Sequence, residues 1–315
     1  MRFLVTGANG WVGRSLCTEL ARRGGKVRAA VRSVDVETQG FERAVVGSID
    51  GNTDWSAALG DVDVVVHLAA RVHVMKDTAA NPLAEFRKVN VAGSLNLARQ
   101  AIAAGVKRIV FVSSVKVHGE YTPPGHAFSE ADLPSPQDSY GVSKHEAEVG
   151  LRQIALGTGM EVVVVRPPLV YGPGAKANFA ALMRAVRLGW PLPLGAVHNQ
   201  RSLVALDNLV DFIITCTTHP QAANETFLVS DGHDLSTTEL VRGLARASGV
   251  PARLLPLPVW ALTAGATLVG KRNNAQRLFG NLRVDISKAC SLLDWHPRVS
   301  VDEGLRRAVA GNQES

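Results

Sequence analysis

Cysteine is scarce in this 315-residue sequence, which contains only Cys17, Cys216 and Cys290. An odd number of widely separated cysteines argues against a disulfide framework and against a zinc site, so we expect no metal centre and a reducing compartment. A signal peptide is also missing ahead of the first apolar run, and we therefore expect a cytoplasmic protein.

Long apolar segments are equally rare. The longest, from Leu254 to Val269, is interrupted by prolines and is too short to cross a bilayer, so we expect no integral membrane segment. We predict that Val259–Val269 forms a buried helix, while Lys271 and Arg272 leave open a helix that lies on a membrane surface.

Acidic residues are fewer than basic ones, and the net charge is +6. The basic residues are dispersed, and no basic segment rich in aromatic residues occurs, so we do not expect nucleic-acid binding. Small polyanionic ligands are sufficient reason for the positive charge. With 46% hydrophobic and 20% charged residues, the chain is expected to form one large domain or two closely joined lobes.

Glycines punctuate the start of the chain. The apolar run Arg2–Thr6 is typical of a buried strand, and a helix is predicted from Val12 to about Arg23. A glycine turn between a strand and a helix amino terminus forms an anion site, because backbone N–H groups and the helix dipole point at a pyrophosphate. Gly7 would permit the tight turn, Gly10 the close approach of phosphate, and Gly13 the packing of helix on strand. The spacing Gly-x-x-Gly-x-x-Gly departs from the usual G-x-G-x-x-G of dinucleotide-binding turns.

A second motif places Tyr140 and Lys144 four residues apart, on one face of a helix. An unperturbed tyrosine has a pKa of about 10, and a nearby positive charge can lower that pKa by about 1–3 units. We therefore predict that Lys144 makes Tyr140 a general acid and base. An isolated pair of this kind would more simply be an exposed Tyr and Lys, so the interpretation depends on companion residues.

Apolar strands alternate with helical stretches over the first half of the chain. The predicted strands are Phe3–Thr6, Lys26–Val31, Val62–Leu68, Ile109–Ser113 and Glu161–Arg166, and the clearest predicted helix is Leu83–Ala104. This order predicts an α/β fold, a Rossmann-type doubly wound parallel sheet with a smaller C-terminal substrate-binding lobe. We assign residues 1–170 to the dinucleotide-binding domain, to which a segment of about 201–225 returns, and residues 171–200 and 226–315 to the smaller lobe.

The companions of the tyrosine motif are Ser113 and Ser114 at the end of a strand, and Asn90 within Val-Asn-Val-Ala-Gly. With these motifs the chain resembles the extended short-chain dehydrogenase/reductase family, and within it the nucleotide-sugar 4-epimerases and 4-ketoreductases. The resemblance covers nearly the whole chain. It implies that Ser114, Tyr140 and Lys144 are catalytic, that Asn90 is the family asparagine, that His67 is a packing residue, and that the protein is a homodimer.

The resemblance also implies ligand-binding residues at the carboxyl ends of the strands. The cofactor-binding set is Gly7, Asn9, Gly10, Trp11, Val12, Gly13, Arg32, Ser33, Ser48, Ile49, Leu68, Ala69, Ala70, Asn90, Ser113, Tyr140, Lys144 and Pro167. The substrate-binding set is Ser114, Lys116, Tyr140, Asn178 and Arg201, with Arg201 gripping the diphosphate. The alternative interpretation of Lys116 is a solvated lysine in a loop.

The end of the second predicted strand bears on cofactor choice. NAD enzymes usually carry Asp or Glu there, whereas this chain has Arg32 followed by Ser33. A guanidinium can pair with a 2′-phosphate, so we expect NADP, with NAD as the alternative. The simpler alternative is that Arg32 faces solvent and contacts no cofactor.

That cofactor favours a reductase, which consumes NADPH, over an epimerase, which keeps NAD bound. Similarity to enzymes of bacterial polysaccharide loci favours a 4-ketoreductase of UDP-2-acetamido-2,6-dideoxy-4-hexulose that forms UDP-N-acetylquinovosamine or its C4 epimer. The alternative is a UDP-glucose or UDP-N-acetylglucosamine 4-epimerase. The chain has no acid pair after Ser114, which disfavours 4,6-dehydration. The Tyr-x-x-x-Lys motif argues against a non-catalytic sensor, and Arg201 against a reductase for hydrophobic ketones.

Overall fold

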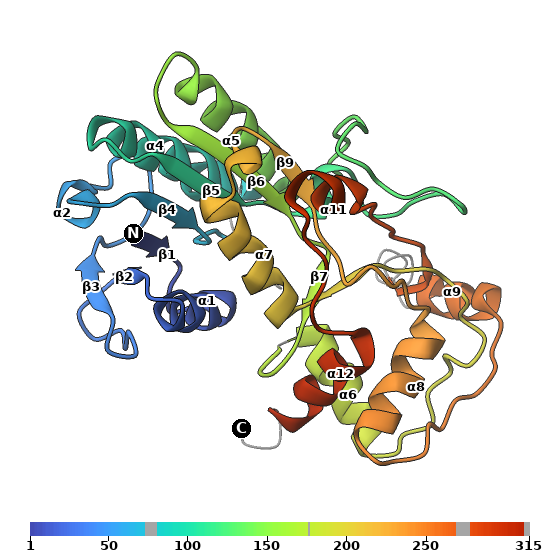
Figure 1. The fold of residues 1–315 in the computed structure, drawn as a ribbon. Helices are drawn as coiled ribbons and strands as arrows, with labels where there is room; N and C mark the ends of the chain where they lie inside the picture. The colour runs from blue at the N-terminus through green and yellow to red at the C-terminus, as the bar shows by residue number, and fades with distance from the viewer. Residues whose placement is uncertain (73–80, 176, 269–277, 312–315) are drawn as a thin grey trace.

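Two lobes of unequal size form the molecule (Figure 1). The computed structural model describes residues 1–72, 81–175, 177–268 and 278–311. The larger lobe holds a seven-stranded parallel sheet with the order β3-β2-β1-β4-β5-β6-β9. Its strands are β1 (Arg2–Thr6), β2 (Lys26–Val31), β3 (Glu42–Val45), β4 (Val64–His67), β5 (Arg108–Val112), β6 (Glu161–Arg166) and β9 (Thr226–Leu228). The predicted doubly wound α/β fold is confirmed.

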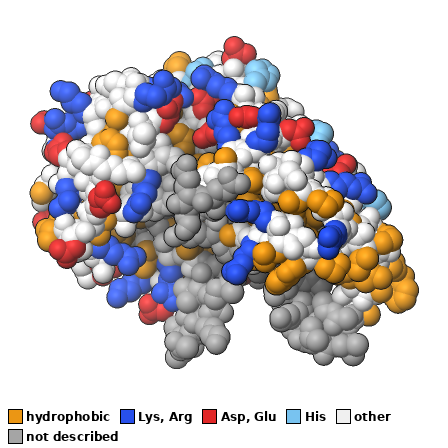
Figure 2. Space-filling model, turned by 90° about the horizontal axis from the view of Figure 1, so that it is seen from below, with side chains coloured by type: hydrophobic (Ala, Val, Ile, Leu, Met, Phe, Trp, Pro, Cys, Tyr) orange, Lys and Arg blue, Asp and Glu red, His pale blue; other side chains and the backbone are white. Residues whose placement is uncertain are grey.

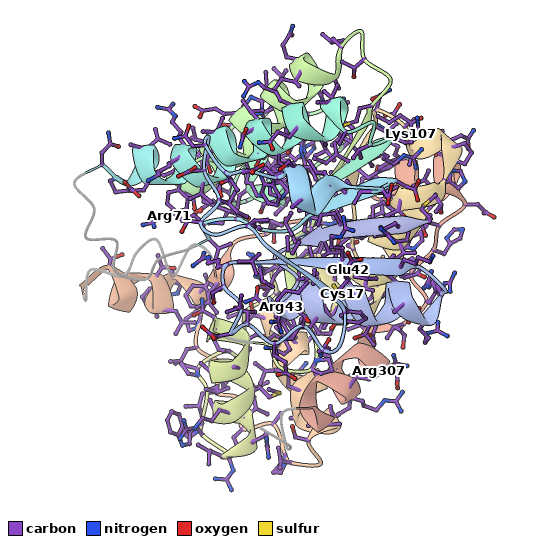
Figure 3. The ribbon with its side chains drawn as sticks, turned by 90° about the vertical axis from the view of Figure 1, so that its left-hand side faces the viewer. Cys17, Glu42, Arg43, Arg71, Lys107 and Arg307 are labelled. Atoms are coloured by element: carbon purple, nitrogen blue, oxygen red, sulfur yellow. The ribbon has the colours of Figure 1, made fainter. Side chains whose placement is uncertain are left out.

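All five predicted strands are present in this sheet, and two of its strands were missed. β3 lies at the sheet edge, and its charged Glu42 and Arg43 are exposed, as Figure 3 shows, so it has no apolar run to reveal it. Charged side chains on an edge strand also discourage pairing with another chain. β9 is only three residues long. Both missed strands therefore depend on pairing with a neighbour rather than on a local pattern.

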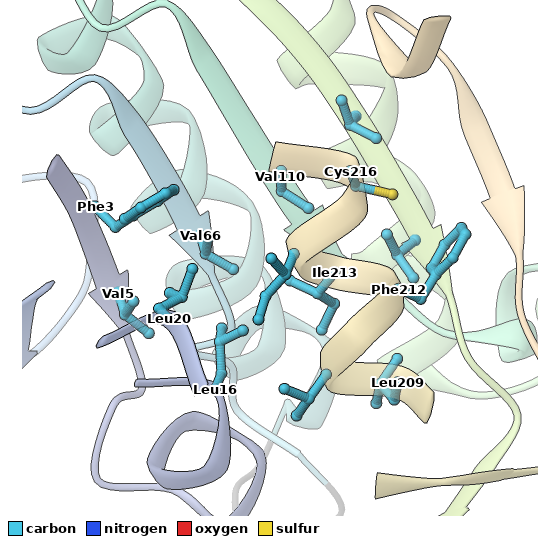
Figure 4. Packing of buried hydrophobic residues seen from close by; sticks show 14 of the residues in the cluster. Phe3, Val5, Leu16, Leu20, Val66, Val110, Leu209, Phe212, Ile213 and Cys216 are labelled. Carbon is cyan, nitrogen blue, oxygen red and sulfur yellow. The ribbon is translucent and has the colours of Figure 1, made fainter. Parts of the chain in front are cut away.

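Both faces of the sheet are buried, which explains the continuous apolar strands. Side chains alternate between two cores, so that Leu4 and Val65 point to one and Val5 and Val66 to the other. The first core contains α4 (Ser94–Ala103) and α5 (Ser139–Ala155) with the short α2 (Ser56–Leu59), and the second contains α1 (Trp11–Arg22) and α7 (Leu206–Thr218). Figure 4 shows the second core, in which Leu16 and Ile213 meet between the sheet and its helices.

The predicted helix 83–104 is divided into three parts. α3 (Pro82–Phe86) continues into a π-helical segment, Arg87–Gly93, and this leads into α4. π-Helical turns widen the helix locally and often occur at functional sites. Here the wide turn contains the buried Asn90.

The smaller lobe packs around its own core. Its elements are the two-stranded parallel sheet of β7 (Leu169–Tyr171) and β8 (Leu203–Ala205), with α6 (Ala177–Arg187), α8 (Thr237–Ala247), α9 (Val259–Leu268) and α12 (Val301–Ala310). The lobes differ from the predicted boundaries. β9, and α11 (Ser287–Leu293) with the following Trp295, belong to the sheet and core of the larger lobe, because β9 pairs with β6 and α11 packs beside it.

Trp11 links the two lobes. Its indole Nε1 donates a hydrogen bond of 2.6 Å to the carbonyl oxygen of Pro173, and its ring packs against the cores of both lobes. We assigned Trp11 to the cofactor site because of its place in the glycine turn. Its side chain has a structural partner 162 residues away, and its cofactor contact stays a prediction.

The helix predicted over Val259–Val269 forms as α9, but the prediction that it is buried is wrong. Trp260 is 75% exposed, and every α9 side chain with a described environment is half-buried or exposed. Val269 lies outside the described residues. None of the described helices is both long enough and apolar enough to cross a membrane.

Gly13→Ala is expected to destabilise the protein. A Cβ at Gly13 would lie 2.1 Å from the carbonyl oxygen of Gly7 and 2.8 Å from Cα of Ala8, so the helix and the turn would have to separate. Overpacking of this kind costs about 1–3 kcal/mol in the free energy of unfolding, which denaturant titration measures. Gly60→Ala is the control, because Gly60 has a φ of −56° and nothing lies within 4 Å of its added Cβ. Equal stabilities of the two variants would contradict the packing argument.

Candidate active site

The carboxyl ends of four strands meet at one edge of the large sheet. Thr6 pairs with Ala30 and with His67, and His67 pairs with Phe111. The segments that follow these strands, which contain the predicted site residues Gly7, Arg32, Leu68 and Ser113, therefore begin at the same edge. In Figure 3, Arg71, which follows β4, lies at the opposite end of the sheet from Lys107, which precedes β5. This edge is where open α/β sheets bind ligands.

The glycine turn fits a dinucleotide. Gly7 has a φ of +68°, and a Cβ there would lie 2.9 Å from the backbone nitrogen of Ala69. Gly10 is the N-cap of α1 and has no side chain to occupy the helix amino terminus. At the same edge of the sheet, after β5, the hydroxyl of the buried Ser113 has no hydrogen-bond partner among the described residues. A bare helix amino terminus and an unpaired buried hydroxyl suit an anionic, polar cofactor.

His67 organises the strand ends. Its Nδ1 lies 2.6 Å from the hydroxyl of Thr6, and its Nε2 lies 2.8 Å from the hydroxyl of Ser94. Ser94 donates to the carbonyl of Asn90, and the Thr6 hydroxyl accepts from the Ala69 N–H. The Thr6 hydroxyl is thereby left to donate to Nδ1, and a neutral ring protonated at Nε2 satisfies every bond. Burial lowers the pKa of His67 to about 3, which agrees with that form. The prediction that His67 is a packing residue is confirmed, and no metal-binding group of side chains occurs in the described part of the chain.

Asn90 connects this edge to the catalytic helix. Its side-chain amide donates to the Arg71 carbonyl at 3.0 Å and to the Ser143 hydroxyl at 2.9 Å, and its oxygen accepts from the Arg71 N–H. Ser143 in turn donates to the carbonyl of Tyr140. The π-helical turn and the start of α5 are thus held together through one buried asparagine.

Tyr140 and Lys144 lie in the first two turns of α5, whose N-cap is Asp138. The Lys144 ammonium is buried, donates at 2.8 Å to the carbonyl of Val112, and lies 4.2 Å from the centre of the Phe111 ring. Val112 ends β5, two residues before Ser114, so this bond places the lysine at the strand end that carries the predicted catalytic serine.

The pKa directions differ from the prediction. Burial, and then the nearby Asp138 carboxylate, raise the pKa of the Tyr140 phenol, whereas we predicted that Lys144 lowers it. Burial also lowers the pKa of Lys144 to about 7, although Glu148 opposes this shift. The physical reason is desolvation, which disfavours the charged form of each group.

Lys116 forms two ion pairs within the protein, and its predicted substrate contact stays a prediction. Its ammonium pairs with Asp138 and, at 3.3 Å, with Glu120. Two carboxylates already balance its charge, which argues against a substrate-phosphate contact and equally against a solvated loop lysine. Through Asp138, Lys116 connects the segment after Ser114 to the N-cap of the catalytic helix.

A buried polar cluster beneath α5 was missed by the sequence analysis. Arg166, at the end of β6, pairs with Glu148 of α5 at 2.5 Å and hydrogen-bonds His118 at 2.8 Å. Burial and the Arg166 charge lower the pKa of His118 to about 4. A charged residue at a strand end, with an acid in the helix that precedes that strand, is a signal that could have revealed this pair.

The remaining predicted ligand contacts lie on segments around this edge. Arg201 is half-buried, donates to the carbonyl of Gly280 at 3.0 Å, and forms no ion pair among the described residues. Burial lowers its pKa. Asn178 is exposed near the start of α6, and Arg32 and Ser33 are exposed beyond β2. The ligand contacts of these residues, and those of Asn9, Val12, Ser48, Ile49, Ala70 and Pro167, stay predictions.

The model of the NAD dependent epimerase/dehydratase family matches residues 3–230. The chain belongs to this family. A UDP-glucose 4-epimerase of Vibrio cholerae is 49% identical over 97% of this chain and 94% of its own length. A UDP-glucose 4-epimerase of Mycolicibacterium smegmatis is 29% identical over 98% of this chain and 97% of its own.

Solved structures of similar proteins share the fold of this protein over 98% or more of the chain. The structure of MoeE5 in complex with UDP-glucose and NAD has a TM-score of 0.80 at 25% identity and covers 100% of this chain and 99% of its own. The UDP-N-acetylglucosamine 4-epimerase of Bacillus cereus has a TM-score of 0.81 at 22% identity, with 98% of each chain covered. Family membership confirms the coarser part of the resemblance, an epimerase-type enzyme with a dinucleotide-binding fold.

Lys144→Met is expected to change how stability depends on pH. An unfolded lysine has a pKa of about 10.4, whereas that of Lys144 is about 7, so folding favours the neutral amine. The stabilisation from the neutral form is complete above about pH 10 and is lost as the pH falls through 7. The free energy of unfolding of the native protein, relative to the variant, should therefore rise between pH 7 and 10 by a few kcal/mol, at about 1.4 kcal/mol per pKa unit.

Denaturant titrations across this pH range measure that difference. The exposed Lys107 provides the matched control, since Lys107→Met removes an ammonium from the surface. A difference between the native protein and Lys144→Met that stays constant from pH 7 to 10 would show that Lys144 is charged in the folded protein.

Proposed function

We propose that this protein is a UDP-sugar 4-epimerase that uses a nicotinamide dinucleotide bound at the glycine turn. The observation that carries the proposal is the bond from Lys144, one turn after Tyr140 on α5, to Val112 at the end of β5, two residues before Ser114. The chain is also 49% identical to a UDP-glucose 4-epimerase. This reverses the preference drawn from the sequence, where the epimerase was the alternative.

The chain's own residues would handle the oxygen and the proton at C4 of the sugar. A nicotinamide dinucleotide held at the glycine turn by Gly7 and Gly10 would supply reversible hydride transfer at C4. The Ser114 hydroxyl would donate a hydrogen bond to the C4 oxygen. Tyr140 would take the proton of the C4 hydroxyl during oxidation and give it back during reduction. Because hydride and proton are both returned, no net oxidation occurs and the cofactor stays bound.

The raised pKa of the Tyr140 phenol sets a requirement for this chemistry. A phenolate forms only when positive charge compensates for burial. The Lys144 ammonium and an oxidised nicotinamide ring both supply such charge, and low dielectric surroundings strengthen the attraction. A bound oxidised dinucleotide would therefore favour the phenolate form of Tyr140.

A 4-ketoreductase of UDP-2-acetamido-2,6-dideoxy-4-hexulose, with UDP-N-acetylquinovosamine or its C4 epimer as product, is the second candidate. Arg32 favours it, because an exposed guanidinium at the end of β2 suits the 2′-phosphate of NADPH. NADP would then be the cofactor, whereas membership of an NAD-dependent family and the NAD bound to MoeE5 favour NAD. The UDP-sugar substrate class and the homodimer are proposals in either case.

The deciding experiment is to purify the protein, identify the retained cofactor, and assay both reactions. Retained NAD with interconversion of UDP-glucose and UDP-galactose, or of the corresponding N-acetyl sugars, would support the epimerase. Stoichiometric oxidation of added NADPH by the 4-hexulose would overturn it in favour of the ketoreductase.

Tyr140→Phe should abolish turnover and leave cofactor binding nearly unchanged, because only the proton donor and acceptor is removed. Turnover and dinucleotide titration measure the two effects separately. Tyr121→Phe is the matched control, since Tyr121 is 54% exposed. Full activity of Tyr140→Phe would remove Tyr140 from the mechanism, and loss of cofactor binding in a folded variant would assign it a binding role.

Arg32→Asp tests the cofactor. If Arg32 pairs with a 2′-phosphate, the variant should bind NADPH at least about tenfold more weakly and NADH no worse, since a charged hydrogen bond contributes about 1.5–3 kcal/mol. Arg43→Asp, an equal change of charge on the exposed edge strand β3, is the control. Unchanged NADPH affinity in Arg32→Asp would leave Arg32 as a solvent-facing residue.

A further inference from the structure

Two apolar segments of the smaller lobe lie side by side at the surface. One follows α6 and runs through Trp190 and Leu192, and the other runs through Arg253 and Leu255 into α9. The N–H of Leu192 donates to the carbonyl of Arg253 at 2.8 Å, and the N–H of Leu255 donates to the carbonyl of Leu192 at 2.8 Å. Paired backbone hydrogen bonds fix the two segments together, so the side chains that they present form one surface.

Five large apolar side chains on these segments and on α9 are exposed to solvent. We call them the apolar face: Leu188 (55% exposed), Trp190 (59%), Leu255 (49%), Leu257 (43%) and Trp260 (75%). Figure 2 shows hydrophobic side chains gathered at one edge of the molecule, on the side where α9 lies in Figure 1. Contiguous apolar surface of this kind marks an interaction site more often than scattered single residues do.

Positive charge borders the apolar face, and the surrounding sequence has no negative charge. No Asp or Glu occurs from residue 162 to 206 or from residue 240 to 284. Arg184 and Arg253 are exposed. The Arg253 guanidinium lies close to Gly189, where an added Cβ would be 3.9 Å from its Cζ, and Gly189 is next to Leu188 and Trp190 in the chain.

We propose that the apolar face docks the protein on an anionic membrane surface. Indole rings and leucine side chains gain free energy at the boundary between lipid headgroups and acyl chains, and arginines beside them contact lipid phosphates. α9 supports this orientation, because Val259–Leu268 contains no charged residue and none of its side chains with a described environment is buried. The docking is peripheral, and it does not depend on which sugar the active site takes.

A second copy of the chain fits this face less well. A two-fold contact would place the same patch on both subunits, and the bordering arginines of one copy would face those of the other. No acidic residue in the flanking sequence could pair with them. An anionic bilayer complements both the apolar side chains and the arginines.

Vesicle co-sedimentation of the full-length protein tests the proposal. The native protein should bind vesicles of phosphatidylglycerol and phosphatidylethanolamine and bind phosphatidylcholine vesicles weakly. The double variant Trp190→Gln/Trp260→Gln should lower the partition coefficient at least about tenfold. It removes two indole rings that would enter the bilayer, and it leaves the net charge unchanged. Leu133→Gln/Leu156→Gln is the matched control, since these leucines are 87% and 69% exposed elsewhere.

Three outcomes would overturn the proposal. The first is a native protein that does not bind the anionic vesicles at low salt. The second is a tryptophan variant that binds as well as the native protein. This result would show that the net positive charge alone causes vesicle binding. The third is self-association that the tryptophan variant abolishes, without vesicle binding, which would give the face to a second copy. Because all the changed side chains are exposed, thermal unfolding should show equal stability in every variant.

Discussion

Burial of both faces of the parallel sheet is the constraint on which the rest of the structure depends. Strands covered on both sides can carry only apolar side chains along their length, as Val64–Val66 and Ile109–Phe111 do. In the central strands β1, β4, β5 and β6, polar and charged groups are therefore confined to the strand ends. Since all seven strands run in parallel, their carboxyl ends collect the glycine turn, His67 and the serines after β5 at one edge.

The same burial sets the chemistry of the site. A phenol and an ammonium held away from water both favour their neutral forms, and this is seen in the raised pKa of Tyr140 and the lowered pKa of Lys144. The protein offsets part of the cost by giving the Lys144 ammonium a carbonyl acceptor and an aromatic face. Charge brought by a ligand would then have a large effect, because little else in the site screens it.

The smaller lobe is built on a different balance. Its core is closed by Tyr171, whose hydroxyl donates to Asp231, and it is joined to the larger lobe through Trp11. Its outer segments are joined by backbone hydrogen bonds, and Leu192 and Leu254 pack against the core of the lobe, whereas Trp190 and Leu255 are exposed. This separation lets the surface of the lobe differ without disturbing the sheet edge where the reaction would take place.

What the sequence by itself determined is local. Five strands, the glycine turn and the helix with Tyr140 and Lys144 could be predicted because runs of apolar residues and fixed spacings encode them over a few residues. The tertiary structure decided the rest. The edge strand β3, the link from Trp11 to Pro173 and the exposure of α9 depend on distant neighbours. The pairing of Lys116 with Asp138 and the pKa of Tyr140 depend on burial and on charges that only the folded chain brings together.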